Sequence, residues 1–253
     1  MTATAKLERT GMSAAEWQTR CDLAALYRVV DHFGWTDIIA THMSARVPGE
    51  PDAFLINHYE EMFHEITASS LIKMNFEGKV LGREGRFNAA GFTIHSGVYK
   101  ARPDANCVMH THTRAGAGVS MLRKGLRAIS QDALNVLDEV VYHEYGMPAT
   151  EEECAALGAS CRRGTCVVLL NHGLLTLAPT VPGALQRLYI LERACELELI
   201  SRTLGEPPAP IADHVVDGVA AYMKAARAKP DYGVHEWNAL LRLVDGKGTD
   251  YRR

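Results

Sequence analysis

The sequence predicts one α/β domain, because two hydrophobic periodicities alternate along a chain of 253 residues. In several segments apolar residues recur every three or four positions, which is the spacing of one helix face. Between these segments lie short apolar runs bounded by turn residues, such as Phe54–Ile56, and such runs are typical of strands. A chain of this length buries a substantial core and lies at the upper size for one domain.

The N-terminal third is expected to hold one helix followed by hairpins. Residues 1–12 are predicted to be a mobile tail, and they lack an apolar segment of signal-peptide length. Ser13–Glu16 is a capping box that opens an amphipathic helix, which continues until Gly34. Between Ile38 and about Leu81 the apolar residues come in short alternating runs, so antiparallel strands are predicted there.

The middle of the chain alternates helices with strands. Asn88 caps a helix that Pro103 ends, and Thr180 caps a long helix with Pro182 in its first turn. The other predicted elements are a strand at Cys107–Thr111, a helix at Ala115–Met121, a strand at Glu139–His143, a helix opened by Thr150–Glu153 and a buried strand at Thr165–Leu170.

The C-terminal part forms a separate helical segment in this scheme. We assign residues 13–206 to the α/β domain and residues 207–253 to an extension that follows the stiff linker Pro207–Pro210. Two short helical patterns, at Val216–Ala226 and Trp237–Val244, predict that this extension packs on the domain or on a neighbouring subunit.

Composition limits the classes of partner. The formal net charge is -3 with interspersed signs, so no basic stripe indicates binding to nucleic acid or to an anionic membrane surface. A small-molecule substrate or another protein chain fits better, and no apolar run reaches membrane-spanning length without charges. The six cysteines form no C-x-x-C pair, so we expect reduced core thiols in a cytoplasmic protein.

Three histidines are candidate metal ligands. Side chains alternate along a strand, so His110 and His112 are predicted to project to the same side of the Cys107–Thr111 strand. His172 follows a second buried run and is expected to supply a third imidazole, which leaves an open position of the kind found in catalytic sites. The alternative is that His110 and His112 are ordinary hydrogen-bonded histidines at a strand end.

Five segments occur together in an order that resembles the class II aldolase/adducin family. They are Leu23–Trp35, Ile66–Leu71, Ala90–His95, Arg102–Asp104 and Asn171–Gly173. The similarity extends from about Cys21 to Leu204, and several segments resemble the adducin head more closely than the sugar-phosphate aldolases.

The resemblance implies an αβα sandwich with a largely antiparallel central sheet, assembled as a homotetramer with active sites at subunit interfaces. It also implies that His110, His112 and His172 hold a divalent metal ion, because their equivalents in the aldolases bind zinc. A set of histidines with few carboxylates suits Zn²⁺, although Mn²⁺, Co²⁺, Ni²⁺ or Fe²⁺ can occupy the same imidazoles.

The chain also departs from the sugar-phosphate aldolases. Those enzymes carry a Ser-Ser-Glu segment whose glutamate is metal ligand and general base, whereas here the segment is Ala89-Ala-Gly91. Glycine neither binds metal nor moves a proton. Thr41-His42 replaces the Gly-Asn phosphate turn, and Asn57–Tyr59 lacks the Thr-x-Thr-Gly pattern. We therefore predict a substrate without phosphate.

Other polar residues are weaker candidates. Tyr145 matches the tyrosine that protonates the leaving group from the neighbouring aldolase subunit, although by itself it also fits a tyrosine packed at a strand end. Glu144 and His143 are candidates for the missing base or carboxylate, but charged residues near a loop are more often solvated. His42 and His58 fall in segments that line the pocket in the family, and His95 fits a core position equally well.

Two functional hypotheses follow. In the first, the protein is a metal-dependent carbon–carbon lyase, and the ion stabilises an enolate formed by aldol cleavage or decarboxylation of a carbonyl, 2-oxo or hydroxy acid. Decarboxylation fits Gly91 better, because loss of carbon dioxide needs no base to remove a C–H proton. In the second, the chain is a non-catalytic oligomeric module like the adducin head.

Overall fold

A central eight-stranded sheet organises the chain. The computed structural model describes residues 11–82, 84–248 and 250–253, so the predicted tail lies, for its first ten residues, outside the described part. The strands are β1 (His42–Arg46), β2 (Ala53–Ile56), β3 (Ile72–Asn75), β4 (Val80–Leu81), β5 (Cys107–Thr111), β6 (Val140–His143), β7 (Cys166–Leu169) and β8 (Gly173–Ala178). Their order is β4-β3-β2-β1-β5-β8-β7-β6, and every pairing is antiparallel except the parallel pair β6–β7.

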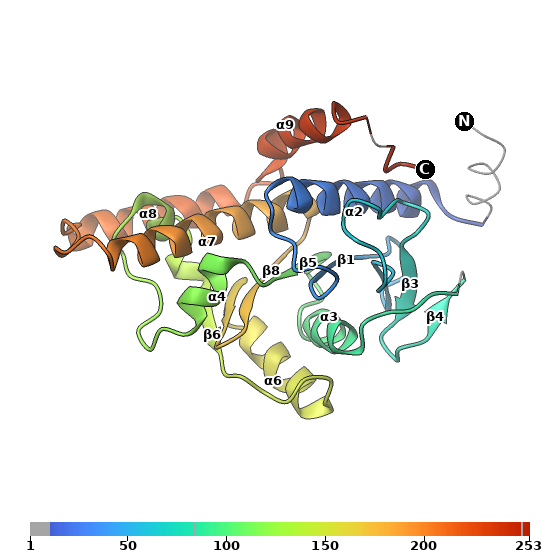
Figure 1. The fold of residues 1–253 in the computed structure, drawn as a ribbon, viewed down its shortest axis with the longest axis horizontal. Coiled ribbons are helices and arrows are strands. Elements are labelled where there is room, and N and C mark those ends of the chain that lie inside the picture. The colour runs from blue at the N-terminus through green and yellow to red at the C-terminus, as the bar shows by residue number, and fades with distance from the viewer. Residues whose placement is uncertain (1–10, 83, 249) are drawn as a thin grey trace.

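Helices cover both faces of this sheet (Figure 1). The helices are α2 (Ala14–His32), α3 (Ala89–Ala101), α4 (Arg114–Ser120), α5 (Gln131–Leu134), α6 (Glu151–Cys161), α7 (Val181–Ser201), α8 (Asp213–Arg227) and α9 (Val234–Asp245), with one 3-10 turn, η1 (Leu137–Glu139). The layers α2 with α7, the sheet, and α3 with α6 confirm the αβα sandwich with a largely antiparallel sheet.

The two faces of the sheet carry separate cores. Met109 of β5 packs in the core that includes α2 and α7, whereas its neighbour Val108 packs in the core that includes α3 and α6. This alternation places His110 on the same side as Val108. The candidate metal ligands on β5 therefore face α3 and α6.

Local capping explains why the flanking helices begin where they do. Ser13 accepts a hydrogen bond from the backbone N–H of Glu16, and Thr180 accepts one from Gly183 at the start of α7. Near the C-terminus, α9 packs on α2 and α7 and buries Trp237. No helix of the described residues is long and apolar enough to cross a membrane.

Strand β8 is the one sheet element that the sequence pattern did not predict. The chain makes a tight turn after β7, where Asn171 has a left-handed backbone with φ of 59°. It then returns as Gly173–Ala178, and this strand lies between β7 and β5. The apolar run shows no alternation because both faces of β8 are buried.

Helices α3 and α6 approach each other closely at two glycines. A Cβ atom at Gly97 of α3 would lie 2.7 Å from the carbonyl oxygen of Cys154, and one at Gly158 of α6 would lie 3.0 Å from the carbonyl oxygen of Gly97. No side chain separates the helix backbones at this point. The absence of two Cβ atoms therefore sets the separation of α3 and α6.

Candidate metal centre

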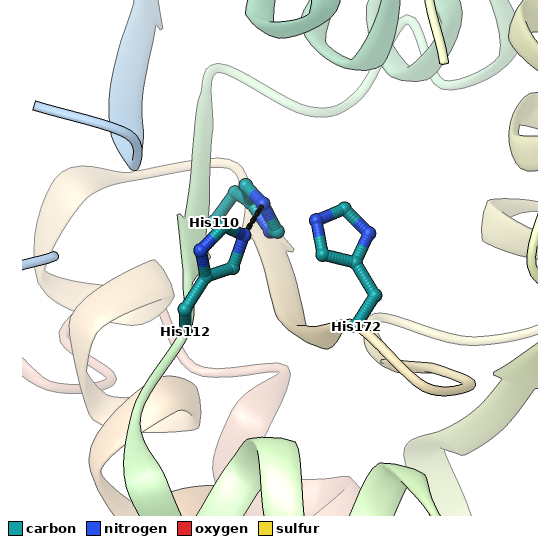
Figure 2. Close-up of side chains that lie close together, drawn as sticks. All are labelled: His110, His112 and His172. Carbon is teal, nitrogen blue, oxygen red and sulfur yellow. Dashed lines mark hydrogen bonds between the residues drawn. The ribbon is translucent and has the colours of Figure 1, made fainter. Parts of the chain in front are cut away.

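His110 lies near the end of β5, at the middle of the sheet. Its ring is buried, and Nδ1 is 3.0 Å from the carbonyl oxygen of Leu174 on the adjacent β8. Nε2 lies 3.0 Å from Nε2 of His112, one residue beyond the end of the strand. The centroids of the two rings are 4.7 Å apart, and the rings meet edge to face. Figure 2 shows these two side chains beside His172.

Asp37 orients the second ring. This residue follows α2, and its carboxylate lies 2.8 Å from Nδ1 of His112. The sequence analysis missed Asp37, because the contact joins residues 75 positions apart. A carboxylate behind an imidazole fixes the tautomer of a metal-binding histidine and makes it a better ligand.

The hydrogen bonds of the two rings favour a cation between them. A carbonyl oxygen only accepts, so Nδ1 of His110 carries the proton and Nε2 of the neutral ring bears a lone pair. An ionised Asp37 has the same effect on His112. Two lone pairs 3.0 Å apart repel each other unless a positive charge lies between them. Zinc–imidazole distances of about 2.0–2.1 Å imply nitrogens about 3.3 Å apart around a tetrahedral ion.

His172 supplies the third imidazole from the β7–β8 turn. The left-handed Asn171 turns the chain, and the backbone N–H of His172 donates to Ser120 Oγ at 3.2 Å. Its ring centroid is 4.7 Å from that of His110, and the candidate ligand atoms of the three histidines lie within 4.8 Å of one another. The structure thus brings together the three predicted ligands, which point towards a common centre (Figure 2).

Burial favours the neutral imidazoles of His110 and His172 in the metal-free protein. It lowers the pKa of His110 well below the usual value, and the nearby His42 and His172 lower it further. The pKa of His172 falls to about 4, mainly through burial and secondarily through His112 and His143. Since metal binding needs the unprotonated nitrogen, these environments fit a divalent cation.

A cavity of about 240 Å³ opens beside the three histidines. Tyr145 lies on its wall, with the ring centroid 6.1 Å from that of His172 in the same chain. The exposed Glu144 also lines the cavity. His143 lies deeper, where its ring nitrogens bond to Ser160 Oγ at 3.0 Å and Glu153 Oε1 at 2.9 Å. Because both nitrogens of His143 are occupied, it is a poor candidate for the missing base.

His42 and His58 have different positions. His42 lines the cavity, and its ring centroid is 5.1 Å from that of His110. His58 lies outside the cavity wall, and its two ring nitrogens are each 3.4 Å from a backbone nitrogen, Nδ1 from that of Glu60 and Nε2 from that of Arg86.

His95 is fully buried in α3 and connects β1 to the cavity. Its Nε2 lies 2.7 Å from Nδ1 of His42, and its Nδ1 lies 2.6 Å from Oγ of Ser44. The hydroxyl of Ser44 is also 2.8 Å from that of Tyr99. No sequence signal marked Ser44 or Tyr99, because β1 and α3 meet only in the folded chain.

Fold and site together define an αβα protein with a candidate metal centre at one end of the central strands. Comparison with known proteins identifies the family. Residues 21–199 match the model of the class II aldolase and adducin N-terminal domain, so the chain belongs to the class II aldolase and adducin family. This confirms the resemblance inferred from the sequence.

The relatives include bacterial proteins and adducins. A Pseudomonas aeruginosa protein whose name provisionally assigns it to aldolase class 2 is 43% identical over 246 residues, which cover 96% of this chain and 95% of that protein. Rat alpha-adducin is 38% identical over 248 residues, which cover 90% of this chain but 33% of the adducin. The chain therefore spans about a third of its adducin relative.

Two solved structures share the fold over the whole domain. An aldolase II superfamily protein from Pseudomonas syringae superimposes with a TM-score of 0.91 at 39% identity, covering 97% of this chain and 99% of that one. L-fuculose 1-phosphate aldolase from Glaciozyma antarctica has a TM-score of 0.82 at 26% identity, with all of both chains covered. Family membership supports a metal-dependent, aldolase-like role, while the adducin relatives fit a non-catalytic one.

Proposed function

We propose that this protein is a metal-dependent carbon–carbon lyase that acts on a carbonyl, 2-oxo or hydroxy acid without phosphate. His110, His112 and His172 are the proposed ligands, and Zn²⁺ is the proposed ion. The observation that carries the proposal is the pair of facing Nε2 atoms 3.0 Å apart, each on a ring whose other nitrogen is held by a hydrogen-bond acceptor.

Each part of the site has a separate task in this proposal. A divalent ion at the three histidines would act as a Lewis acid for the negative charge that develops on a substrate carbonyl oxygen. Leu174 and Asp37 hold two of the rings in the tautomer that binds metal. Tyr145, on the cavity wall, is the proposed general acid that returns a proton to the carbanionic carbon.

Gly91 favours decarboxylation over aldol addition within this class. A substrate that loses carbon dioxide generates its carbanion without a base, so a glycine at the usual glutamate position is compatible with that reaction. The described residues on the cavity wall also include no lysine or arginine, which are the usual partners of a phosphate group. This second observation supports a substrate without phosphate.

Assembly and location complete the proposal. We expect a cytoplasmic homotetramer, as for the aldolases that the chain resembles. Tyr145 already reaches the cavity of its own chain, so its proposed role does not require a neighbouring subunit to deliver it. The second candidate function, a non-catalytic module like the adducin head, is favoured by the 38% identity to alpha-adducin.

Metal content tests the first half of the proposal. Protein purified without a histidine tag should contain close to one zinc per chain, and a His110→Ala/His112→Ala variant should contain almost none. His58→Leu is the matched control, since His58 lies off the cavity wall. Wild-type protein that stays folded but takes up neither zinc nor manganese would contradict the lyase and favour the adducin-like module.

Turnover tests the second half. The metal-loaded protein should release carbon dioxide or an aldehyde from some member of a panel of 2-oxo acids and hydroxy acids. Tyr145→Phe should lower kcat by about 10²- to 10⁴-fold, the usual contribution of a general acid, with zinc content unchanged. An unchanged kcat would remove Tyr145 from the mechanism.

A further inference from the structure

A buried chain of hydrogen bonds ends at the cavity beside the metal centre. It begins at the hydroxyl of Tyr99, passes through Ser44 Oγ and the two nitrogens of His95, and ends at Nδ1 of His42, with successive distances of 2.8, 2.6 and 2.7 Å. Tyr99, Ser44 and His95 are at most 1% exposed, so solvent does not supply alternative partners to them. Each proton in the chain must therefore lie on one or other of these groups.

Counting protons gives this chain of hydrogen bonds one favoured direction of donation. If His42 Nδ1–H donated to His95, then His95 would donate to Ser44 and Ser44 to Tyr99, which would leave the buried Tyr99 hydroxyl proton without an acceptor among the described residues. In the opposite direction Tyr99 donates to Ser44, Ser44 to His95, and His95 to His42, and of these four groups only the N–H at Nε2 of His42, which lines the cavity, has no acceptor among the described residues. An unsatisfied donor costs more in the core than at a cavity, where water or a ligand can accept its hydrogen bond, so the second direction is preferred.

This direction fixes the tautomer of His42. Its Nδ1 accepts from His95, so the proton of the neutral ring is on Nε2. That atom has no hydrogen-bond partner among the described residues, and the ring lines the cavity next to His110. His42 thus presents a free N–H donor at the metal centre.

Gly91 provides the space for this ring. A Cβ atom at position 91 would lie 2.8 Å from His42 Nε2 and 2.7 Å from its Cδ2. The donor therefore occupies the region where any larger residue at position 91 would project. The donor thus lies where the resemblance to the sugar-phosphate aldolases places their glutamate side chain.

We propose that His42 Nε2–H binds a carboxylate oxygen of the substrate. Resting on the proposed function, this inference narrows the substrate class to acids with a carboxylate next to the carbonyl or hydroxyl carbon, because such a group reaches the donor and the three histidines together. The described residues of the cavity wall include no lysine or arginine. The N–H of His42 therefore gives the substrate carboxylate a hydrogen bond that no cationic side chain of the wall supplies.

Oxalate is a suitable probe, since it is a small dicarboxylate that resembles the planar enolate formed by decarboxylation. Calorimetry on the zinc-loaded full-length protein should show oxalate binding about 10- to 100-fold weaker in His42→Leu, the usual effect of losing a hydrogen bond to a charged group. His42→Gln, which keeps an N–H near the same place, should lose less. His58→Leu is the control with an intact cavity.

A second pair of variants tests the chain of hydrogen bonds that leads to His42, at positions away from the cavity. Ser44→Ala removes the group that sets the direction, so it should weaken oxalate binding. In Tyr99→Phe the Ser44 hydroxyl still has only His95 as acceptor, so the direction persists and the loss should be smaller. Oxalate affinity unchanged in His42→Leu, with zinc content preserved, would overturn the proposal.

The tautomer provides a readout that does not depend on the lyase. ¹⁵N-histidine NMR should place the proton of His42 on Nε2, with the signal assigned by its loss in His42→Leu. A proton on Nδ1 overturns the proposal whether or not zinc is bound. Failure of the proposed function has a different signature, namely wild-type protein that holds no metal.

Discussion

The contact between Gly91 and His42 makes a quantitative prediction about stability. A methyl group at position 91 would lie 2.7 Å from His42 Cδ2, whereas carbon atoms pack without strain at about 3.5–4.0 Å. The imidazole has little room to retreat, because it is 3% exposed and Nδ1 is 2.7 Å from His95 Nε2. Gly91→Ala must therefore displace a buried, hydrogen-bonded ring.

The expected cost follows from three contributions. Overpacking a filled site costs about 1–3 kcal/mol, and a weakened His42–His95 hydrogen bond adds about 1 kcal/mol. Replacing glycine by alanine within a helix returns about 0.5–1 kcal/mol. Gly91→Ala should thus lower the free energy of unfolding by about 1–3 kcal/mol.

A double-mutant cycle isolates the contact. In a His42→Ala background the space is open, so Gly91→Ala should be neutral or slightly stabilising, and the coupling energy should be about 2 kcal/mol. Urea unfolding in the presence of EDTA, at one protein concentration, measures all four proteins without a contribution from metal binding.

Gly218→Ala is the matched control. Gly218 also lies inside a helix, α8, but a Cβ atom there would meet nothing within 4 Å. It should gain about 0.5–1 kcal/mol from helix propensity alone. If Gly91→Ala cost the same with and without His42, the steric argument would be refuted, and with it the arrangement of His42 in the cavity.

Three further predictions concern the metal centre and its surroundings. Asp37→Ala should weaken zinc binding by about 10- to 100-fold in a chelator competition, because the carboxylate that orients His112 is lost; unaltered affinity would show that Asp37 has no such role. Gly173→Ala should destabilise the fold by about 1–3 kcal/mol in urea titrations, since its Cβ would lie 2.4 Å from the carbonyl oxygen of Thr111, and a neutral effect would argue against this close strand approach. Burial lowers the pKa of His95 from 6.5 to about 3, so between these pH values the unfolded chain binds a proton that the folded chain does not. The stability of the metal-free protein should therefore rise with pH across this window. Thermal melts in EDTA with a melting temperature that stays constant across this window would contradict the burial of His95.

The sequence predicted those parts of the fold that local signals determine. Ser13, Asn88, Thr150 and Thr180 cap helices as expected, because a side-chain cap and the following backbone lie within one turn. Strand β8 was missed because only residues 170–172 separate it from β7, and both strands are buried on both faces, so no change of period marks where one ends and the next begins.

The candidate site likewise has residues that local sequence signals predict and residues that they do not. His110 and His112 follow from strand alternation, and their convergence with His172 is present in the structure. Asp37, Ser44 and the direction of the His42–His95 hydrogen bond depend on contacts across the fold. Spacing along the chain carries no information about such partners, and the sequence analysis could therefore list His42 and His95 but not connect them.

The close contact of α3 and α6 has a consequence for how the cavity can change. Leu157 and Glu153 of α6 form part of the cavity wall, while Gly97 and Gly158 lie behind it and set the distance between the two helices. A larger residue at either glycine would push α6 outwards and enlarge the cavity without changing the identity of any wall residue. Selection for a bulkier or smaller substrate can thus act on a spacer that the substrate never touches.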